Sequence, residues 1–137
     1  MGEADTVRIA IDDEQGIVTA RKTGRDMARD MGFRAVDAAQ LATAISELAR
    51  NILLYANRGE IVIAVLDPSG TRQGIQVTAA DQGPGIADIG IVMQDGYSTS
   101  DGLGLGLPGT RRIVDQFEIS SNPGQGTLVR IIKWLHR

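Results

Sequence analysis

Apolar and polar residues alternate near the start of the chain, where Val7, Ile9 and Ile11 occupy every second position. A period of two is typical of a strand with one buried face. Apolar positions then recur at helical spacing over residues 13–31, and in steps of four and three over residues 37–56. The pattern therefore predicts one strand followed by two amphipathic helices.

The second half of the chain is rich in β-branched runs and turn sequences. Residues 60–66 and 74–80 are such runs, and the Pro and Gly between them at residues 67–70 predict a hairpin turn. Residues 82–101 follow without sustained periodicity. After them the pattern predicts a third helix and a second hairpin, at residues 107–116, 117–121 and 127–134.

This order of elements indicates the fold class. Helices that come before and between antiparallel hairpins favour a two-layer α/β sandwich. In this arrangement a mixed, mostly antiparallel sheet is covered on one face by helices. The length of 137 residues fits one domain that spans residues 1–137.

Composition narrows the classes of function. The chain has 42% hydrophobic and 23% charged residues, a net charge of −3 and no cysteine. The lack of cysteine and the single histidine exclude a zinc ribbon, a thiol nucleophile and a histidine-rich metal site. The acidic balance argues against a nucleic-acid partner, and no apolar stretch approaches the roughly 20 residues of a membrane span. We expect a cytoplasmic protein that binds neither nucleic acid nor membrane.

Glu47 and Asn51 are four residues apart on the second predicted helix, so their side chains share one face beside the apolar stripe. A carboxylate can accept a proton from a hydroxyl group or water. An amide oxygen can join the oxygen shell of a hard cation. The alternative is an ordinary solvated helix face, which carries such pairs often.

The sequence DQGPGI comes directly after a predicted strand and begins at Asp81. The carboxylate offers acceptors and no donor, which suits the exocyclic amine of adenine. Gly83 and Gly85, followed by Ile86, would let the backbone approach a flat ring closely. The alternative is a plain Gly-Pro turn at the end of a strand.

A glycine-rich loop, SDGLGLGLP, leads into the third predicted helix. Backbone amides and the helix dipole at such a terminus suit a polyphosphate. Residues 82–101 before it have the length of a functional lid. A last cluster, GQGT, ends at Thr127, where an ordinary hairpin turn is the alternative. The candidate phosphate-binding residues are Gly102, Leu103, Gly104, Leu105 and Gly106.

In this order, the four motifs resemble those of the GHKL ATPases, which include gyrase B, heat-shock protein 90, MutL and histidine kinases. The resemblance covers nearly the whole chain and implies the Bergerat ATP-binding fold, with residues 82–101 as the ATP lid. The matching positions are Glu47 and Asn51 in the N box; Asp81, Gly83 and Gly85 in G1; Gly102, Gly104 and Gly106 in G2; and Gly126 and Thr127 in G3.

Further features indicate which group of the superfamily the chain resembles. Histidine kinases carry Asn at the position of Glu47, and we expect neither phosphoacceptor helices nor a transducer domain after Thr127. The chain is most similar to the small anti-sigma-factor serine/threonine kinases, and among them to the switch kinases of the stressosome. That resemblance implies ATP-dependent phosphorylation of Ser or Thr on STAS-domain proteins of the RsbS or RsbR type. It also implies that the released kinase activates a downstream phosphatase or another effector.

The resemblance assigns a role to each residue. Asn51 would hold Mg²⁺, the amides of residues 102–106 would cradle the phosphates of ATP, and Asp81 and Thr127 would select adenine. Glu47 would be the catalytic residue that orients or deprotonates the acceptor hydroxyl. The alternative function is an ATP-sensing, partner-binding switch with little or no kinase activity. The candidates for a γ-phosphate contact are Arg50, Arg111 and Arg112.

Overall fold

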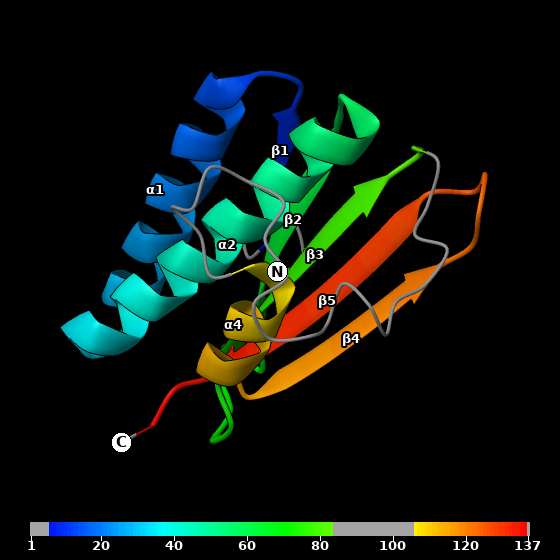
Figure 1. Cartoon of the computed structure of the whole chain (residues 1–137). Helices are drawn as coiled ribbons and strands as arrows, with labels where there is room; N and C mark the ends of the chain where they lie inside the picture. The colour runs from blue at the N-terminus through cyan, green and yellow to red at the C-terminus, as the bar shows by residue number, and fades with distance from the viewer. Residues whose placement is uncertain (1–5, 84–105, 137) are drawn as a thin grey trace.

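The computed structural model describes residues 6–83 and 106–136, which form a two-layer α/β sandwich (Figure 1). The described elements follow the predicted order along the chain. They are β1 (Thr6–Ile11), α1 (Glu14–Met31), α2 (Ala35–Ala56), β2 (Gly59–Leu66), β3 (Gly74–Asp81), α4 (Gly106–Ile113), β4 (Gln116–Ser121) and β5 (Thr127–Trp134).

The five strands form one sheet in the order β1-β2-β3-β5-β4, and all four pairings are antiparallel. The described helices lie on one face of this sheet (Figure 1). The expected sandwich with a mostly antiparallel sheet is therefore confirmed. Because β5 enters between β3 and β4, the end of β3 lies beside the start of β5, and Asp81 pairs with Thr127.

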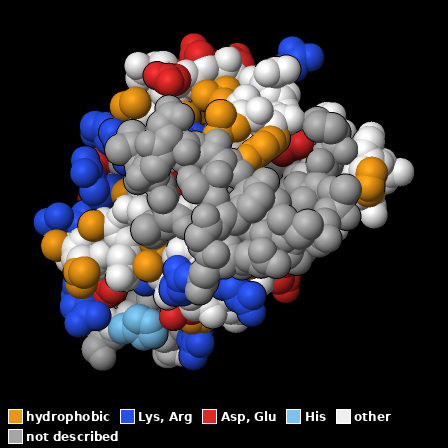
Figure 2. All heavy atoms as spheres, viewed as in Figure 1, with side chains coloured by type: hydrophobic (Ala, Val, Ile, Leu, Met, Phe, Trp, Pro, Cys, Tyr) orange, Lys and Arg blue, Asp and Glu red, His pale blue; other side chains and the backbone are white. Residues whose placement is uncertain are grey.

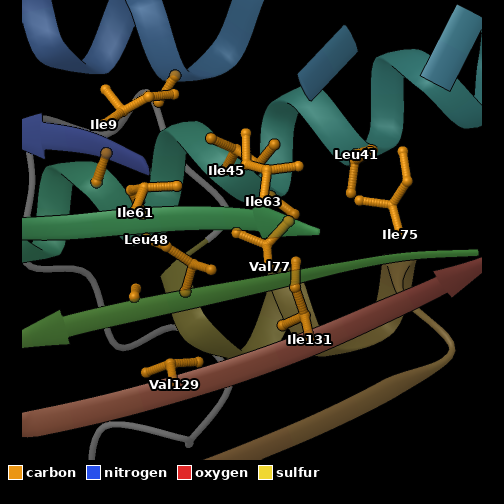
Figure 3. Packing of buried hydrophobic residues seen from close by; sticks show 14 of the residues in the cluster. Ile9, Leu41, Ile45, Leu48, Ile61, Ile63, Ile75, Val77, Val129 and Ile131 are labelled. Atoms are coloured by element: carbon orange, nitrogen blue, oxygen red, sulfur yellow. The ribbon is translucent and has the colours of Figure 1, made fainter. Parts of the chain in front are cut away.

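The core lies between α2 and the middle of the sheet (Figure 3). Alternate residues of the strands point toward the helices, as a period of two requires. Burying each large aliphatic side chain contributes about 1.5–3 kcal/mol. The fully or almost fully buried members of this layer are Leu41, Ile45 and Leu48 of α2 and Ile61, Ile63, Ile75, Val77 and Ile131 of the sheet.

The ends of the helices have identifiable causes. The side chain of Asp13 accepts a hydrogen bond from the amide of Gly16 and starts α1, and Gly32 ends it with a φ of 101°. The prediction that the third helix reaches residue 116 is wrong, because α4 ends at Ile113. The amide of Asp115 already donates to the carbonyl of Ile132 in the sheet. No helix in the described ranges is long and apolar enough to cross a membrane.

Positive charge gathers on α1, although the net charge of the chain is −3. Figure 2 shows Lys and Arg side chains along the side of the molecule where α1 lies in Figure 1. Lys22 donates to Asp26 at 2.8 Å, and this hydrogen bond holds the pKa of the Asp26 carboxyl below its usual value. The basic residues that α1 exposes are Arg21, Lys22, Arg25 and Arg29.

A buried lysine ties β5 to the ends of two helices. The side chain of Lys133 is only 8% exposed, and its Nζ donates to the carbonyl of Ile113, the last residue of α4, at 2.9 Å. The same Nζ lies 4.0 Å from Oδ1 of Asp37 in the first turn of α2. Oδ2 of Asp37 accepts from Arg34 at 3.0 Å. Lys133 therefore fixes α4 relative to the sheet and to α2.

We expect Lys133→Met to lower the free energy of unfolding by about 1–2 kcal/mol, because the carbonyl of Ile113 loses its charged donor in a buried position. Urea unfolding measures the change. Lys22→Met, at a side chain that is 69% exposed, is the matched control and should change stability by less than about 0.5 kcal/mol. Equal stability of the two variants would show that the buried contact contributes nothing.

Candidate nucleotide-binding site

The end of β3 presents a carboxylate that backbone amides hold in place. Oδ1 of Asp81 accepts from the amide of Gly83 at 2.9 Å and from the amide of Thr127 at 3.3 Å. Val77 and Ala79, which alternate with polar residues in β3, are buried under the helices, so Asp81 points to the same face. Oδ2 takes no part in these two bonds. It is therefore the oxygen that can accept a hydrogen bond from a ligand.

Thr127 adds a second acceptor beside Asp81. Residues directly opposite each other in an antiparallel pair share a face of the sheet, and Thr127 is opposite Asp81. The hydroxyl of Ser121 donates to the carbonyl of Gly126 at 3.0 Å and lies 2.8 Å from Oγ1 of Thr127. Either hydroxyl can be the donor between them, and in both cases Oγ1 of Thr127 keeps a lone pair for a ligand.

The motif glycines allow close backbone packing around Asp81. Gly126 has a φ of 90°, and a Cβ there would lie 2.1 Å from the carbonyl oxygen of Asp81. A Cβ at Gly83 would lie 2.5 Å from that of Ala56, at the end of α2. From the sequence, we expected Gly83 to let the backbone approach the adenine ring closely. The structure shows that Gly83 also lets the segment after β3 pack against α2.

The helical wall of the site contains Glu47 and Asn51, one turn apart on α2. Glu47 is only 4% exposed and Asn51 is half-buried. The alternative of a solvated helix face is therefore wrong for Glu47. Its Oε1 lies 3.7 Å from Nη1 of Arg50. The apolar residues of α2 that face the sheet, such as Leu48 and Ile52, fix the helix and hence the pair.

The third wall is the start of α4. This helix packs against α2 and begins at Gly106, which has a φ of 66°. Leu107 belongs to the core, and the hydroxyl of Thr110 donates to the carbonyl of Gly106 at 2.9 Å. Amides in the first turn of a helix have no partner within the helix, and the dipole favours an anion there. Gly106 thus lies where the G2 motif predicts phosphate contacts.

The structure describes the positions of some of the predicted site residues. It brings Asp81, Gly83 and Thr127 together at one end of the sheet and Glu47 beside Asn51 on the helix above it. The lid lies outside the described residues apart from residues 82 and 83. The other predicted residues outside the described ranges are Gly85, Ile86, Gly102, Leu103, Gly104 and Leu105.

The three arginine candidates for a γ-phosphate contact are placed differently. Arg111 and Arg112 are exposed in the last turn of α4, about 8 Å along the helix axis from Gly106. Arg50 contacts Glu47. Arg50 therefore lies beside a predicted catalytic side chain.

Ser121 was missed by the sequence analysis. It supports Thr127 through its hydroxyl, and its only signal is its place in the register, opposite Thr127 across the β4–β5 hairpin. A serine before a Pro-Gly turn is common, so local sequence did not single it out.

Comparison with known proteins agrees with this geometry. Residues 36–137 match the sequence model of the family described as histidine kinase-, DNA gyrase B-, and HSP90-like ATPase. The chain is 51% identical over 135 residues to the protein named serine/threonine-protein kinase RsbT of Bacillus subtilis (strain 168), covering 98% of this chain and 99% of that protein. It is 31% identical to an anti-sigma F factor of Caldanaerobacter subterraneus subsp. tengcongensis, covering 72% of this chain and 71% of the relative.

Solved structures show the same fold. A Mycobacterium tuberculosis protein with RsbU and RsbW domains matches with a TM-score of 0.67 and 18% identity, over 96% of this chain. The match spans 33% of that longer chain. The mycobacterial sensor histidine kinase MprB matches with a TM-score of 0.53 and 18% identity, over 95% of this chain and 99% of that one. At this level of identity the likeness concerns the fold alone.

Proposed function

Because the chain belongs to the family of histidine kinase-, DNA gyrase B- and HSP90-like ATPases, we propose that it is an ATP-dependent serine/threonine protein kinase of a partner-switching system. The observation that carries this proposal is the position of Glu47. It is a buried carboxylate one helical turn from Asn51, and it lies in the N box, where histidine kinases carry Asn. A carboxylate there can accept the proton of a hydroxyl acceptor.

Adenine is the base that Asp81 and Thr127, at the end of the sheet, would bind. Oδ2 of Asp81 and Oγ1 of Thr127 both present lone pairs on the same face of the sheet. The exocyclic amine of adenine has two N–H donors and no acceptor, so it complements this pair. Guanine presents a carbonyl oxygen at the corresponding position, which the Asp81 carboxylate would repel. The site would therefore distinguish ATP from GTP.

The residues present fit a Mg²⁺ ion that is shared with ATP. Asn51 is half-buried and offers one amide oxygen. Within residues 6–83 and 106–136, no group of three or more His, Cys, Asp or Glu side chains could hold a metal ion by itself. Mg²⁺ commonly takes one or two protein oxygens and completes its shell with phosphates and water. When bound, the ion would supply charge neutralisation at the phosphates, and Asn51 would hold it.

In phosphoryl transfer the main task of the protein is to position the acceptor hydroxyl and the phosphates of ATP. The oxygen of an acceptor Ser or Thr forms a bond to the γ-phosphorus, and the bond from that phosphorus to the β–γ bridging oxygen breaks. The electron pair of the broken bond leaves with ADP. Glu47 would take the hydroxyl proton on its carboxylate, and the amides of residues 102–106 would contact the phosphates.

We extend the proposal to the partners that the resemblance implies. The substrates would be STAS-domain proteins of the RsbS or RsbR type, and the released kinase would activate a phosphatase or another effector in the cytoplasm. The name of the Bacillus subtilis relative supports the kinase activity, and the chain aligns with nearly all of that relative. Residues 1–137 would act as a single ATP-binding kinase domain.

A second candidate is an ATP-sensing switch that works by binding a partner, with little or no phosphoryl transfer. The observation in its favour is that two relatives carry the name anti-sigma F factor, a name that refers to another protein and to no reaction. In that case the same Asp81 and Asn51 contacts would bind ATP, and Glu47 would have no proton to accept.

Transfer of label from γ-labelled ATP to a purified STAS-domain protein distinguishes the two functions. A kinase gives label on Ser or Thr of the STAS protein, located by mass spectrometry, and the label depends on Mg²⁺. Binding of ATP without label on any STAS protein would contradict kinase activity and favour the switch. A STAS protein with Ala in place of the labelled residue is the control for the acceptor.

A further inference from the structure

Arg50 lies beside the carboxylate that the proposed reaction uses. Nη1 of Arg50 is 3.7 Å from Oε1 of Glu47, one helical turn away on α2. The Glu47 side chain is 6% exposed and that of Arg50 is 30% exposed, so the cation is the more solvent-accessible member of the pair.

The other basic residues of the chain that have known ion partners bind carboxylates other than Glu47. Five other basic residues of the described ranges form ion pairs with other carboxylates: Arg8, Lys22, Arg34, Arg130 and Lys133. The G1 motif, the lid and the G2 motif contain no Lys or Arg, because none occurs between Arg72 and Arg111. Residues 84–105 therefore contain no lysine or arginine that could replace Arg50 at Glu47.

The distance indicates an orienting contact. A close charge-assisted hydrogen bond between guanidinium and carboxylate is about 2.7–2.9 Å long, so the 3.7 Å observed here is a longer, electrostatic contact between the two charges. A guanidinium is planar and always charged, so it restricts the orientation of a carboxylate more than an ammonium group does.

We propose that Arg50 is a positioning residue for phosphoryl transfer and acts through Glu47. This inference rests on the proposed function of Glu47 as proton acceptor. Arg50 orients the carboxylate so that one oxygen faces the acceptor hydroxyl. In the transfer step the hydroxyl proton moves to that oxygen, the acceptor oxygen bonds to the γ-phosphorus, and ADP leaves with the electron pair.

Single-turnover transfer with Arg50→Gln and Arg50→Lys tests the proposal. Arg50→Gln should slow transfer at least about tenfold and leave ATP affinity within about twofold, because only the proton acceptor is misplaced. Arg50→Lys, which keeps the charge, should recover part of the rate. Arg58→Gln, at an exposed arginine just after α2, is the matched control and should transfer at the normal rate. A normal rate in Arg50→Gln would overturn the proposal.

A double-mutant cycle with Glu47→Gln shows whether Arg50 acts through Glu47. In the Glu47→Gln background, Arg50→Gln should change the transfer rate by less than about threefold. The full slowing in that background would overturn the proposal, as would an equal loss of ATP affinity and transfer. If the unsubstituted protein transfers no label to Ser or Thr, the proposed function has failed instead, and the two failures are therefore distinct.

Discussion

Glu47→Gln should slow phosphoryl transfer by about 10²–10⁴-fold, equivalent to roughly 3–5 kcal/mol of barrier, and leave ATP affinity unchanged. Gln keeps the length and volume of the side chain at a position that is 4% exposed, so packing on α2 is preserved. It removes the oxygen that takes the hydroxyl proton. Single-turnover transfer and ATP titration, measured on the same preparation, give the two quantities.

Glu60→Gln is the matched control for this substitution. Glu60 is a glutamate on β2 that pairs with Arg8 on the surface and, because it alternates with the buried Ile61, lies on the face of the sheet opposite the helices. Its transfer rate should equal that of the unsubstituted protein. If Glu47→Gln also transferred at close to the normal rate, Glu47 would not be the proton acceptor, whatever the protein phosphorylates.

Asp81→Asn should weaken ATP binding by about 100-fold, close to 3 kcal/mol. The amide oxygen of Asn can keep the bonds that Oδ1 accepts from Gly83 and Thr127, so the end of the sheet remains folded. The amide nitrogen then replaces Oδ2 and presents donors to the donors of the adenine amine. Selectivity between ATP and GTP should fall, because a carbonyl oxygen on the base is no longer repelled.

Asp115→Asn provides the control at the other end of β5. Its Oδ2 accepts from the amide of Trp134 at 2.7 Å, just as Asp81 accepts from Thr127. Calorimetric titration with ATP should give normal affinity for this variant. Normal affinity in Asp81→Asn as well would remove Asp81 from adenine recognition.

Hydrophobic periodicity predicted each described helix and strand, because each buries one stripe or one face. It did not predict the neighbours of β5. That strand pairs with β3 as well as with β4, and the contact between Asp81 and Thr127 joins positions 46 residues apart. Pairing at this range depends on the packing of the whole sheet, and only the order of the motifs indicated it.

The candidate site was predicted from residue types, but its environment was not. The sequence left a solvated face as the alternative for the flank of α2 that carries Glu47. Helical periodicity locates the apolar stripe, but it does not show whether the residues beside the stripe are buried. The structure buries Glu47 and places Arg50 against it. Similarly, α4 ends before residue 116 because Asp115 already joins the sheet, a long-range contact that local helix propensity does not contain.

A crystal structure of the protein with Mg²⁺ and a non-hydrolysable ATP analogue tests most directly whether these residues form one nucleotide site. We predict the adenine amine at about 2.7–3.2 Å from Oδ2 of Asp81, the metal ion on Asn51, and the γ-phosphate facing Glu47. A nucleotide bound elsewhere, or one whose γ-phosphate points away from Glu47, would contradict the account.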